Sequence, residues 1–179
     1  MSIRVHINPT EMWDEDNARF VNTKPLDITI EHCLSSVSEW EAKWEQAFLG
    51  RKKKTTEMII DYIRCMVVDH SVTYEDLIGL TSSENEEALK QIQDYIASRQ
   101  SATFFQNQRH ATGGPRDLPT SEVMYSWMVE YGIDWEAQYW HLNRFLNLVH
   151  ICNIHEERKQ KAENEAYRKA KARSTPRRR

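Results

Sequence analysis

The chain has 179 residues, of which 40% are hydrophobic and six are tryptophan, and this composition argues against intrinsic disorder over most of its length. It is long enough for one domain with a hydrophobic core. Five glycines and five prolines are few, which favours long helices over a turn-rich β-sandwich.

Neither a membrane span nor a signal peptide is evident in the sequence. No stretch approaches the roughly 18 consecutive apolar residues that a membrane span requires, and residues 1–6 hold no apolar signal-peptide core. We therefore expect a cytoplasmic protein with no membrane partner. Cys33, Cys65 and Cys152 are an odd and widely scattered set, so reduced, buried thiols are the expected state.

The net charge of −3 hides a strong polarity along the chain. Residues 156–179 hold ten Lys/Arg against four Asp/Glu, whereas residues 1–155 hold 14 against 23, so a basic tail follows an acidic body. Such a tail binds nucleic acid, docks on an acidic protein, or stays a solvated helix that frays into a disordered end. The last interpretation is favoured because order is usually poor near a free terminus.

The N-terminal residues are predicted to form β-strands. Ile3, Val5 and Ile7 alternate with polar residues, as a half-buried strand would. Residues 19–23 and 26–31 are two further short runs with strand character. The expected assembly is a small antiparallel β-hairpin or three-stranded sheet that is packed on a helical bundle.

The hydrophobic period then becomes helical and remains so over residues 34–155. Thr55 or Thr56 is placed to cap one helix. Gly50 and Gly132 are placed to end two others.

The last predicted helix is the longest, and Asp134 is placed to cap it. One apolar stripe of this helix runs through Trp135 and Tyr139, and a second runs through Trp140. Because apolar residues lie on two faces, the helix is expected to be central to the fold as far as about His155.

The predicted fold class is α+β, predominantly α-helical, with a long C-terminal helix. Residues 1–157 are expected to form a single globular domain, β-rich over 1–32 and helical over 34–155. Within it, residues 106–119 contain a Gly-Gly-Pro sequence and are expected to be an exposed loop. Residues 158–179 are expected to form a basic helical or disordered tail.

No nucleophile–base pair and no complete metal-ligand set is evident. His150, Cys152 and His155 are the best metal candidates, but His150 is off the helix face that the other two share, and a fourth ligand is missing. Carboxylates such as Glu41 and Glu45 are expected on solvated helix exteriors. The sequence therefore predicts no catalytic residue, no metal site and no cofactor.

Tryptophans at helical spacing among charged residues are the most informative feature. Large aromatic area without catalytic apparatus indicates a helical protein that acts through packing, against itself or against a partner. A core tryptophan and a tryptophan of a binding groove look identical in sequence. The candidate partner-binding residues are Trp40, Trp44, Trp135, Trp140 and Arg144.

The order of segments along the chain carries a resemblance to a known family. An N-terminal hairpin ends in the strand-like run 26–31, and a Lys/Arg-rich stretch closes the chain. The helical segments between them are Ser38-Glu39-Trp40-Glu41-Ala42-Lys43-Trp44-Glu45-x-x-Phe48-Leu49, Thr55-Thr56-Glu57 with Asp61-Tyr62-Ile63-Arg64-Cys65-Met66, Thr120-Ser121-Glu122 with Tyr125-x-Trp127-Met128, and Trp140-His141-Leu142-Asn143-Arg144-Phe145-Leu146. Together they resemble the tail assembly chaperones of long-tailed bacteriophages, which are encoded near the tape measure protein. The resemblance spans most of the chain, from about Ile3 to the tail.

The resemblance implies a protein that is not an enzyme. Such chaperones bind the long helical tape measure protein in the host bacterial cytoplasm, keep its apolar faces from aggregating, and are shed as tail tube subunits polymerise around it. A partner with an apolar groove covers an amphipathic helix without ATP. Two alternatives remain from other classes: a structural virion component such as a connector or minor tail protein, and a small nucleic-acid-binding regulator that uses the basic tail.

Overall fold

An antiparallel β-ribbon begins the chain in the computed structural model, which describes residues 2–14, 19–103 and 119–174. Strand β1 (Ile3–Ile7) pairs with β4 (Leu26–Ile30), with Val5 opposite Ile28. Apolar residues of one face are buried at Val5, Ile7, Ile28 and Ile30, and the alternating Arg4, His6 and Asp27 are exposed, as the period of two predicts. The mixed α+β fold predicted from the sequence is therefore confirmed, with a hairpin as its sheet.

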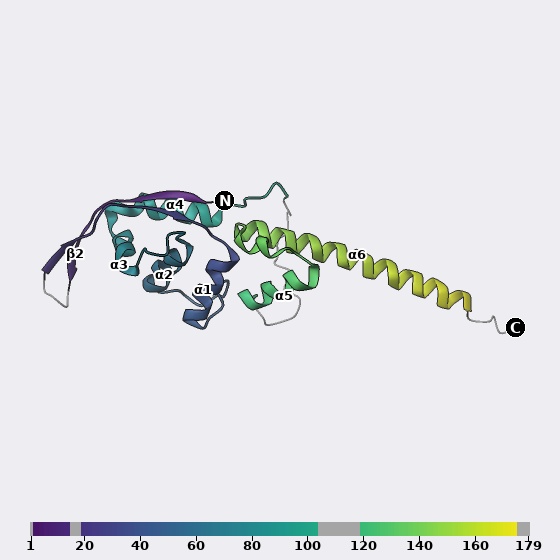
Figure 1. Ribbon diagram of the computed structural model, residues 1–179. Helices are drawn as coiled ribbons and strands as arrows, with labels where there is room; N and C mark the ends of the chain where they lie inside the picture. Colours follow the sequence, from purple (N-terminus) through teal and green to yellow (C-terminus); the bar gives the residue numbers. More distant parts are fainter. Residues whose placement is uncertain (1, 15–18, 104–118, 175–179) are drawn as a thin grey trace.

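The ribbon continues past β1 and β4 as a second ladder. Strand β2 (Glu11–Asp14) pairs with β3 (Arg19–Asn22), and the two strands extend away from the helices in Figure 1. Thr10 and Thr23 join the two ladders, because the Thr23 N–H donates to the Thr10 carbonyl at 2.9 Å and the Thr10 N–H donates to Thr23 Oγ1 at 2.8 Å. Strand β2 is an element that the sequence pattern did not predict.

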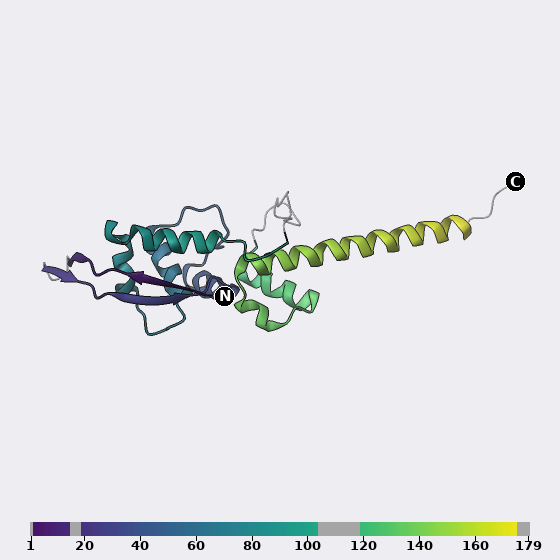
Figure 2. The same ribbon diagram turned by 90° about the horizontal axis from the view of Figure 1, so that it is seen from above.

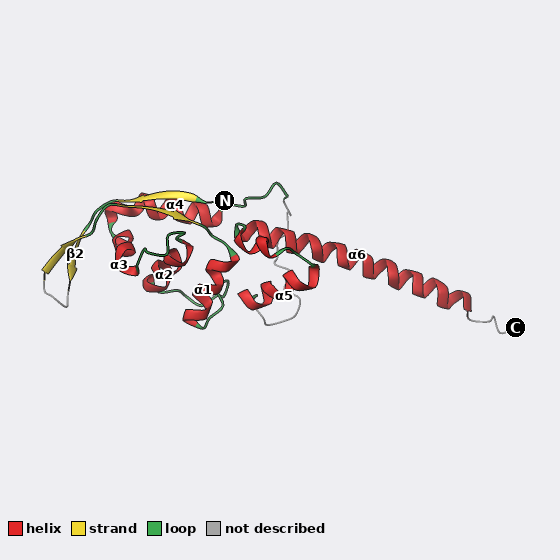
Figure 3. Cartoon of the chain, in the orientation of Figure 1, coloured by secondary structure: helices red, strands yellow, loops and turns green. Residues whose placement is uncertain are grey.

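Helices cover the β1–β4 ladder and fill the body of the protein (Figure 3). Helix α4 packs against β1, where the Gln91 side chain donates to the Arg4 carbonyl at 3.2 Å. The buried core includes Trp40, Ile63 and Phe145, each at most 1% exposed. The elements of the body are α1 (Leu34–Trp44), α2 (Thr56–Met66), α3 (Tyr74–Leu77), η1 (Ile78–Thr81), η2 (Ser83–Asn85) and α4 (Glu86–Ala97).

The sequence predicted some helix ends correctly and others wrongly. Thr55 caps α2, since its side chain accepts the Met58 N–H, as predicted. Helix α1 ends at Glu45, which adopts a left-handed φ of 48°, and not at Gly50 as the pattern predicted. Gly50 instead closes a tight turn, in which its N–H donates to the Ala47 carbonyl at 3.0 Å. A Cβ at this position would lie 2.8 Å from the same oxygen, so the turn favours glycine.

The C-terminal part consists of α5 (Ser121–Tyr131), the 3-10 helix η3 (Trp135–Tyr139) and α6 (Leu142–Ser174). Gly132 ends α5 with a φ of 61°, as predicted. The predicted loop 106–119 lies outside the described residues except for Pro119.

The predicted long C-terminal helix is confirmed, but its predicted start at Asp134 is wrong, because the chain breaks between η3 and α6. Asp134 caps only η3, where its side chain accepts the Glu136 N–H at 2.8 Å. His141 then forms an isolated bridge with Cys33, and the Leu142 N–H donates to the His32 carbonyl at 2.8 Å. These contacts with the end of the β-ribbon hold residues 140–141 in extended backbone and start a new helix.

Helix α6 leaves the body and projects from it, as Figures 1 and 2 show from two directions. Its first turns pack on the core through Phe145 and Val149, and the Tyr131 hydroxyl of α5 donates to Asn153. Residues 157–171 are all exposed. At 1.5 Å per residue, the 33 residues of α6 span about 50 Å.

Candidate partner-binding surface

Trp40 belongs to the interior of the protein. Its side chain is 0% exposed, and its indole N–H donates to the Met58 carbonyl at 2.8 Å. The ring meets Phe48 edge-on at a centroid distance of 5.4 Å and Tyr62 at 6.4 Å. Every polar and apolar surface of this side chain is therefore used inside the chain, where it joins α1 to α2.

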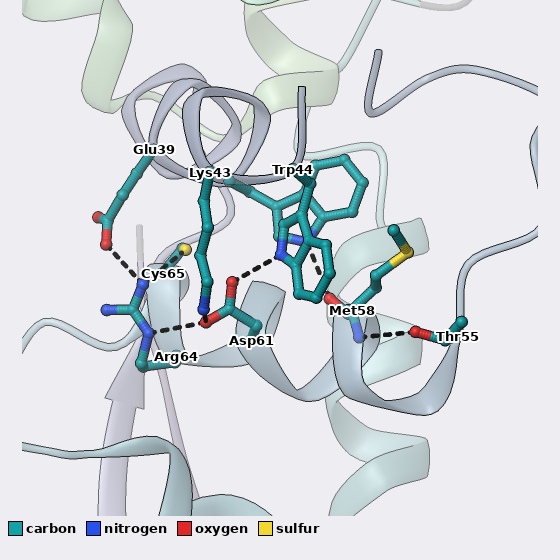
Figure 4. A network of polar contacts seen from close by, with 9 residues as sticks. Glu39, Lys43, Trp44, Thr55, Met58, Asp61, Arg64 and Cys65 are labelled. Atoms are coloured by element: carbon teal, nitrogen blue, oxygen red, sulfur yellow. Dashed lines mark hydrogen bonds and ion pairs between the residues drawn. The ribbon is translucent and has the colours of Figure 1, made fainter. Parts of the chain in front are cut away.

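Trp44, one turn later, takes part in a buried polar network between α1 and α2 (Figure 4). The Asp61 side chain is 1% exposed and accepts hydrogen bonds from Lys43 Nζ at 2.7 Å and from Trp44 Nε1 at 2.8 Å. Arg64 Nε donates to the same carboxylate at 3.0 Å, and its Nη2 donates to Glu39 at 2.9 Å.

Burial alone would raise the pKa of Asp61, because it disfavours the charged form. The hydrogen bonds from Lys43, Trp44 and Arg64 outweigh burial and hold the pKa of this carboxyl below its ordinary value. Asp61 is thus an ionised, fully partnered carboxylate, and its role is to fix α1 against α2.

Glu41 is also buried, although carboxylates of this segment were expected on the surface. One carboxylate oxygen accepts the Phe48 N–H at 2.6 Å, and the other accepts the Ser121 N–H at 2.6 Å. Ser121 is the first residue of α5, so Glu41 supplies an acceptor to the N-terminal end of that helix, where free N–H groups and the helix dipole favour negative charge. This contact holds α5 on α1.

Two histidines hold the start of α6. His32 Nδ1 shares a hydrogen bond with the Tyr62 hydroxyl at 2.5 Å, and its ring lies edge-on to His141 at 5.0 Å. His141 Nε2 donates to the Tyr95 carbonyl at 3.0 Å, while its Nδ1 accepts the Asn143 N–H at 3.3 Å. Burial, together with the neighbouring His141, lowers the pKa of His32 to about 3. Burial also lowers the pKa of His141. Both rings are therefore neutral packing groups near pH 7.

An exposed aromatic cluster, formed by Tyr125, Trp135 and Tyr139, lies where α5 meets η3. Trp135 is 55% exposed and Tyr139 is 53% exposed. Tyr125 is half-buried, with its ring centroid 5.7 Å from that of Trp135, and its hydroxyl donates to the Gln138 side chain at 3.2 Å. Large aromatic rings held at a surface by such contacts are typical of a protein-binding site.

Beside the break at residues 140–141, Arg144 lies over the ring of Trp140. Its guanidinium carbon is 4.2 Å from the ring centroid, which is cation–π geometry. Trp140 is half-buried against the core, whereas Arg144 is exposed. The pair adds an arginine and a further aromatic ring to the surface of the same segment.

Known proteins give no further guide to this surface. No family model, curated protein or solved structure matches the chain. Across the described residues, no helix combines the length and apolar character needed to cross a membrane. The case for a site is therefore made from the residues of this chain.

The five candidate residues divide into two groups. Trp40 and Trp44 lie in and around the α1–α2 interior, while Trp135, Trp140 and Arg144 lie along residues 135–144 at the surface. Sequence reasoning missed Tyr139 as an exposed residue, because it placed Tyr139 on the inner stripe of a continuous helix. The signal that could have found it is Asp134, because aspartate caps short helical turns as well as long helices. Trp135 and Tyr139, which follow it, therefore need not lie on the inner stripe of a long helix.

Among the described residues, neither the three cysteines nor the histidines of α6 form a nucleophilic or metal-binding site. Cys33 and Cys65 are buried as expected, whereas Cys152, on the part of α6 that leaves the body, is only half-buried. Burial raises the pKa of the Cys65 thiol to about 12 and also raises the pKa of Cys152. Such thiols are poor nucleophiles at neutral pH. In the part of the chain that the structure describes, which includes His150, Cys152 and His155, no group of three or more His, Cys, Asp or Glu side chains could hold a metal ion.

Proposed function

We propose that this protein is a tail assembly chaperone of a long-tailed bacteriophage, which binds the tape measure protein through the aromatic cluster. The exposure of Trp135 and Tyr139 carries the protein-binding part of the proposal. The identity of the client follows from the sequence resemblance. In this proposal the chain has no enzymatic role and no cofactor, and it works in the host bacterial cytoplasm, where it also meets tail tube subunits.

The geometry of the cluster suits an amphipathic helix as client. Trp135 and Tyr139 offer broad apolar faces, and Arg144 next to Trp140 offers a charge for the polar edge of such a helix. Tryptophan, tyrosine and arginine are the residues that most often dominate binding energy at interfaces. Because the Tyr125–Gln138 hydrogen bond and the Asp134 cap fix this segment, little side-chain entropy is lost on binding.

The test is binding of the intact protein to a fragment of the tape measure protein from the same phage, measured by titration calorimetry. We expect Trp135→Ala with Tyr139→Ala to weaken binding by about tenfold or more, since each ring is an exposed anchor. Val129→Ala is the matched control, because Val129 is 70% exposed on α5 and lies outside the cluster. Equal affinity in all three proteins would refute the aromatic cluster as the client site.

Two other functions can each be distinguished from the chaperone function by one measurement. The exposed basic residues of α6 favour a nucleic-acid-binding regulator as the second candidate. Such a protein binds DNA or RNA with an affinity that falls steeply with salt, whereas apolar contacts with a client are weakened little by salt. A structural virion component, in contrast, is present in purified virions, from which a chaperone is absent.

A further inference from the structure

The C-terminal half of α6 forms an exposed basic arm, here defined as residues 158–171. It carries six Lys/Arg and two Glu, and every one of its residues is exposed. One of the two glutamates, Glu165, lies 4.0 Å from Lys169, so the arm keeps a surplus of positive charge. Figures 1 and 2 show this part of the helix projecting from the body.

An acidic end lies on the other side of the molecule. No Lys or Arg occurs between Arg64 and Lys90, and this stretch contains α3, η2 and the start of α4. Five of its exposed carboxylates define the acidic end: Glu75, Asp76, Glu84, Glu86 and Glu87. A sixth, Asp69, precedes α3.

The basic arm cannot reach the acidic end of its own chain. The Asn143 side chain donates to the carbonyls of Ile96 at 3.0 Å and Ser98 at 2.8 Å, which fixes the start of α6 at the C-terminal end of α4. The acidic residues lie at the opposite, N-terminal end of α4. Since α6 is one continuous helix that leads away from the body, the two charged regions lie at opposite ends of the molecule (Figure 1).

We propose that the basic arm of one copy docks on the acidic end of a second copy. Charge complementarity carries this inference, because the two regions have opposite charge, are both exposed and are separated within one chain. A contact between two different surfaces leaves one acidic end and one basic arm unused at the tips of every dimer. Association is therefore head-to-tail: where one such contact joins two copies, further copies can add at the unused ends. This inference is independent of the proposed client site, which lies at Trp135 and Tyr139.

Salt controls this association. Individual exposed ion pairs are weak, and charges more than about 10 Å apart are screened at about 0.1 M salt. Several pairs along one helix act together at low salt. We expect the full-length protein to form oligomers in about 20 mM salt and monomers in about 500 mM salt.

Sedimentation velocity on charge-reversed variants of the full chain tests the proposal. The first variant combines Glu75→Lys, Glu84→Lys and Glu87→Lys, and leaves Asp76 in place because it caps α3. The second combines Arg158→Glu, Lys161→Glu and Arg168→Glu, which exchanges good helix formers. At low salt we expect the wild type to exceed its monomer mass of 21.2 kDa about twofold or more, and each variant alone to stay monomeric. A 1:1 mixture of the two variants should associate again. The unchanged basic arm of the first variant then meets the unchanged acidic end of the second, and the reversed arm of the second meets the reversed end of the first.

The matched control combines Glu122→Lys, Glu130→Lys and Glu136→Lys, which changes net charge equally at exposed positions on α5 and η3. This control should associate as the wild type does. A wild type that stays monomeric at low salt, or a mixture that fails to associate while circular dichroism shows both variants folded, would overturn the proposal. Salt-steep binding of the basic arm to duplex DNA by a monomeric protein would assign the arm to nucleic acid instead.

Discussion

The segments around Trp40 and Trp135 are alike in sequence and opposite in structure. Each places tryptophans and charges at helical spacing, yet Trp40 is 0% exposed and Trp135 is 55% exposed. Trp40 lies in a regular helix that packs on α2. Trp135 lies in a 3-10 helix that ends where His141 bridges to Cys33. Two tryptophans in similar sequence surroundings thus lie in different kinds of helix and differ in burial.

The sharpest way to break this comparison is to remove the two rings in turn. Trp40→Ala should lower the free energy of unfolding by about 3–5 kcal/mol, because it leaves a large cavity and removes the hydrogen bond from the indole to the Met58 carbonyl. Trp135→Ala should lower it by about 0.5 kcal/mol, as for most surface changes. Urea denaturation followed by circular dichroism measures both. Similar losses for the two variants would mean that Trp135 is as much a core residue as Trp40.

The buried network at Asp61 gives the next largest effect. Asp61→Ala should cost about 3 kcal/mol of unfolding free energy, because Lys43 and Arg64 lose their shared carboxylate partner. Glu57→Ala, at the exposed first turn of the same helix, should cost only about 0.5 kcal/mol. Chemical denaturation of both variants at neutral pH provides the comparison. If the Asp61 variant were as stable as the Glu57 variant, the Asp61 network would make no contribution to the free energy of unfolding.

The buried histidine His32 makes the stability of the folded protein depend on pH. The pKa of His32 falls from 6.5 to about 3 in the folded protein, so below about pH 6.5 the unfolded chain takes up a proton that the folded chain does not. Stability is therefore full above that pH and falls as the pH decreases toward 3, by about 2 kcal/mol at pH 5.

Denaturation curves at pH 7 and pH 5 measure this loss. In His32→Gln the difference between the two pH values should become smaller, and the part that remains belongs to His141, whose pKa is also lowered by burial. Asp61 does not confound the measurement: its pKa is lowered from 3.8, so its contribution is lost only at lower pH. An unchanged pH dependence in the His32 variant would place the titrating group elsewhere.

Local signals in the sequence predicted much of the fold. The alternation of Val5 and Ile7 with polar neighbours marked β1, and Thr55 and Gly132 marked two helix ends, because each of these signals acts on residues next to it. The extent of α1 was overestimated, since a non-glycine residue, Glu45, takes the left-handed position that ends it.

The candidate site was only partly predictable. Trp135, Trp140 and Arg144 were found by composition, but the chain break beside them involves a bridge between His141 and Cys33, which are distant in sequence. Burial of Glu41 and Asp61 was missed for the same reason. A carboxylate is buried only where partners such as the Ser121 N–H meet it, and periodicity does not show such partners.

The hydrogen bond between Glu41 and Ser121 can form only late in synthesis, after Ser121 has been added to the chain. The two residues are 80 positions apart, and a ribosome adds residues at about 5–20 per second, so Glu41 leaves the exit tunnel about 4–16 s before its partner. Through that interval one oxygen of Glu41 lacks the Ser121 N–H as its donor. The aromatic cluster, whose Tyr125 is carried by α5, is therefore assembled late, after the part of the chain that supports it has emerged.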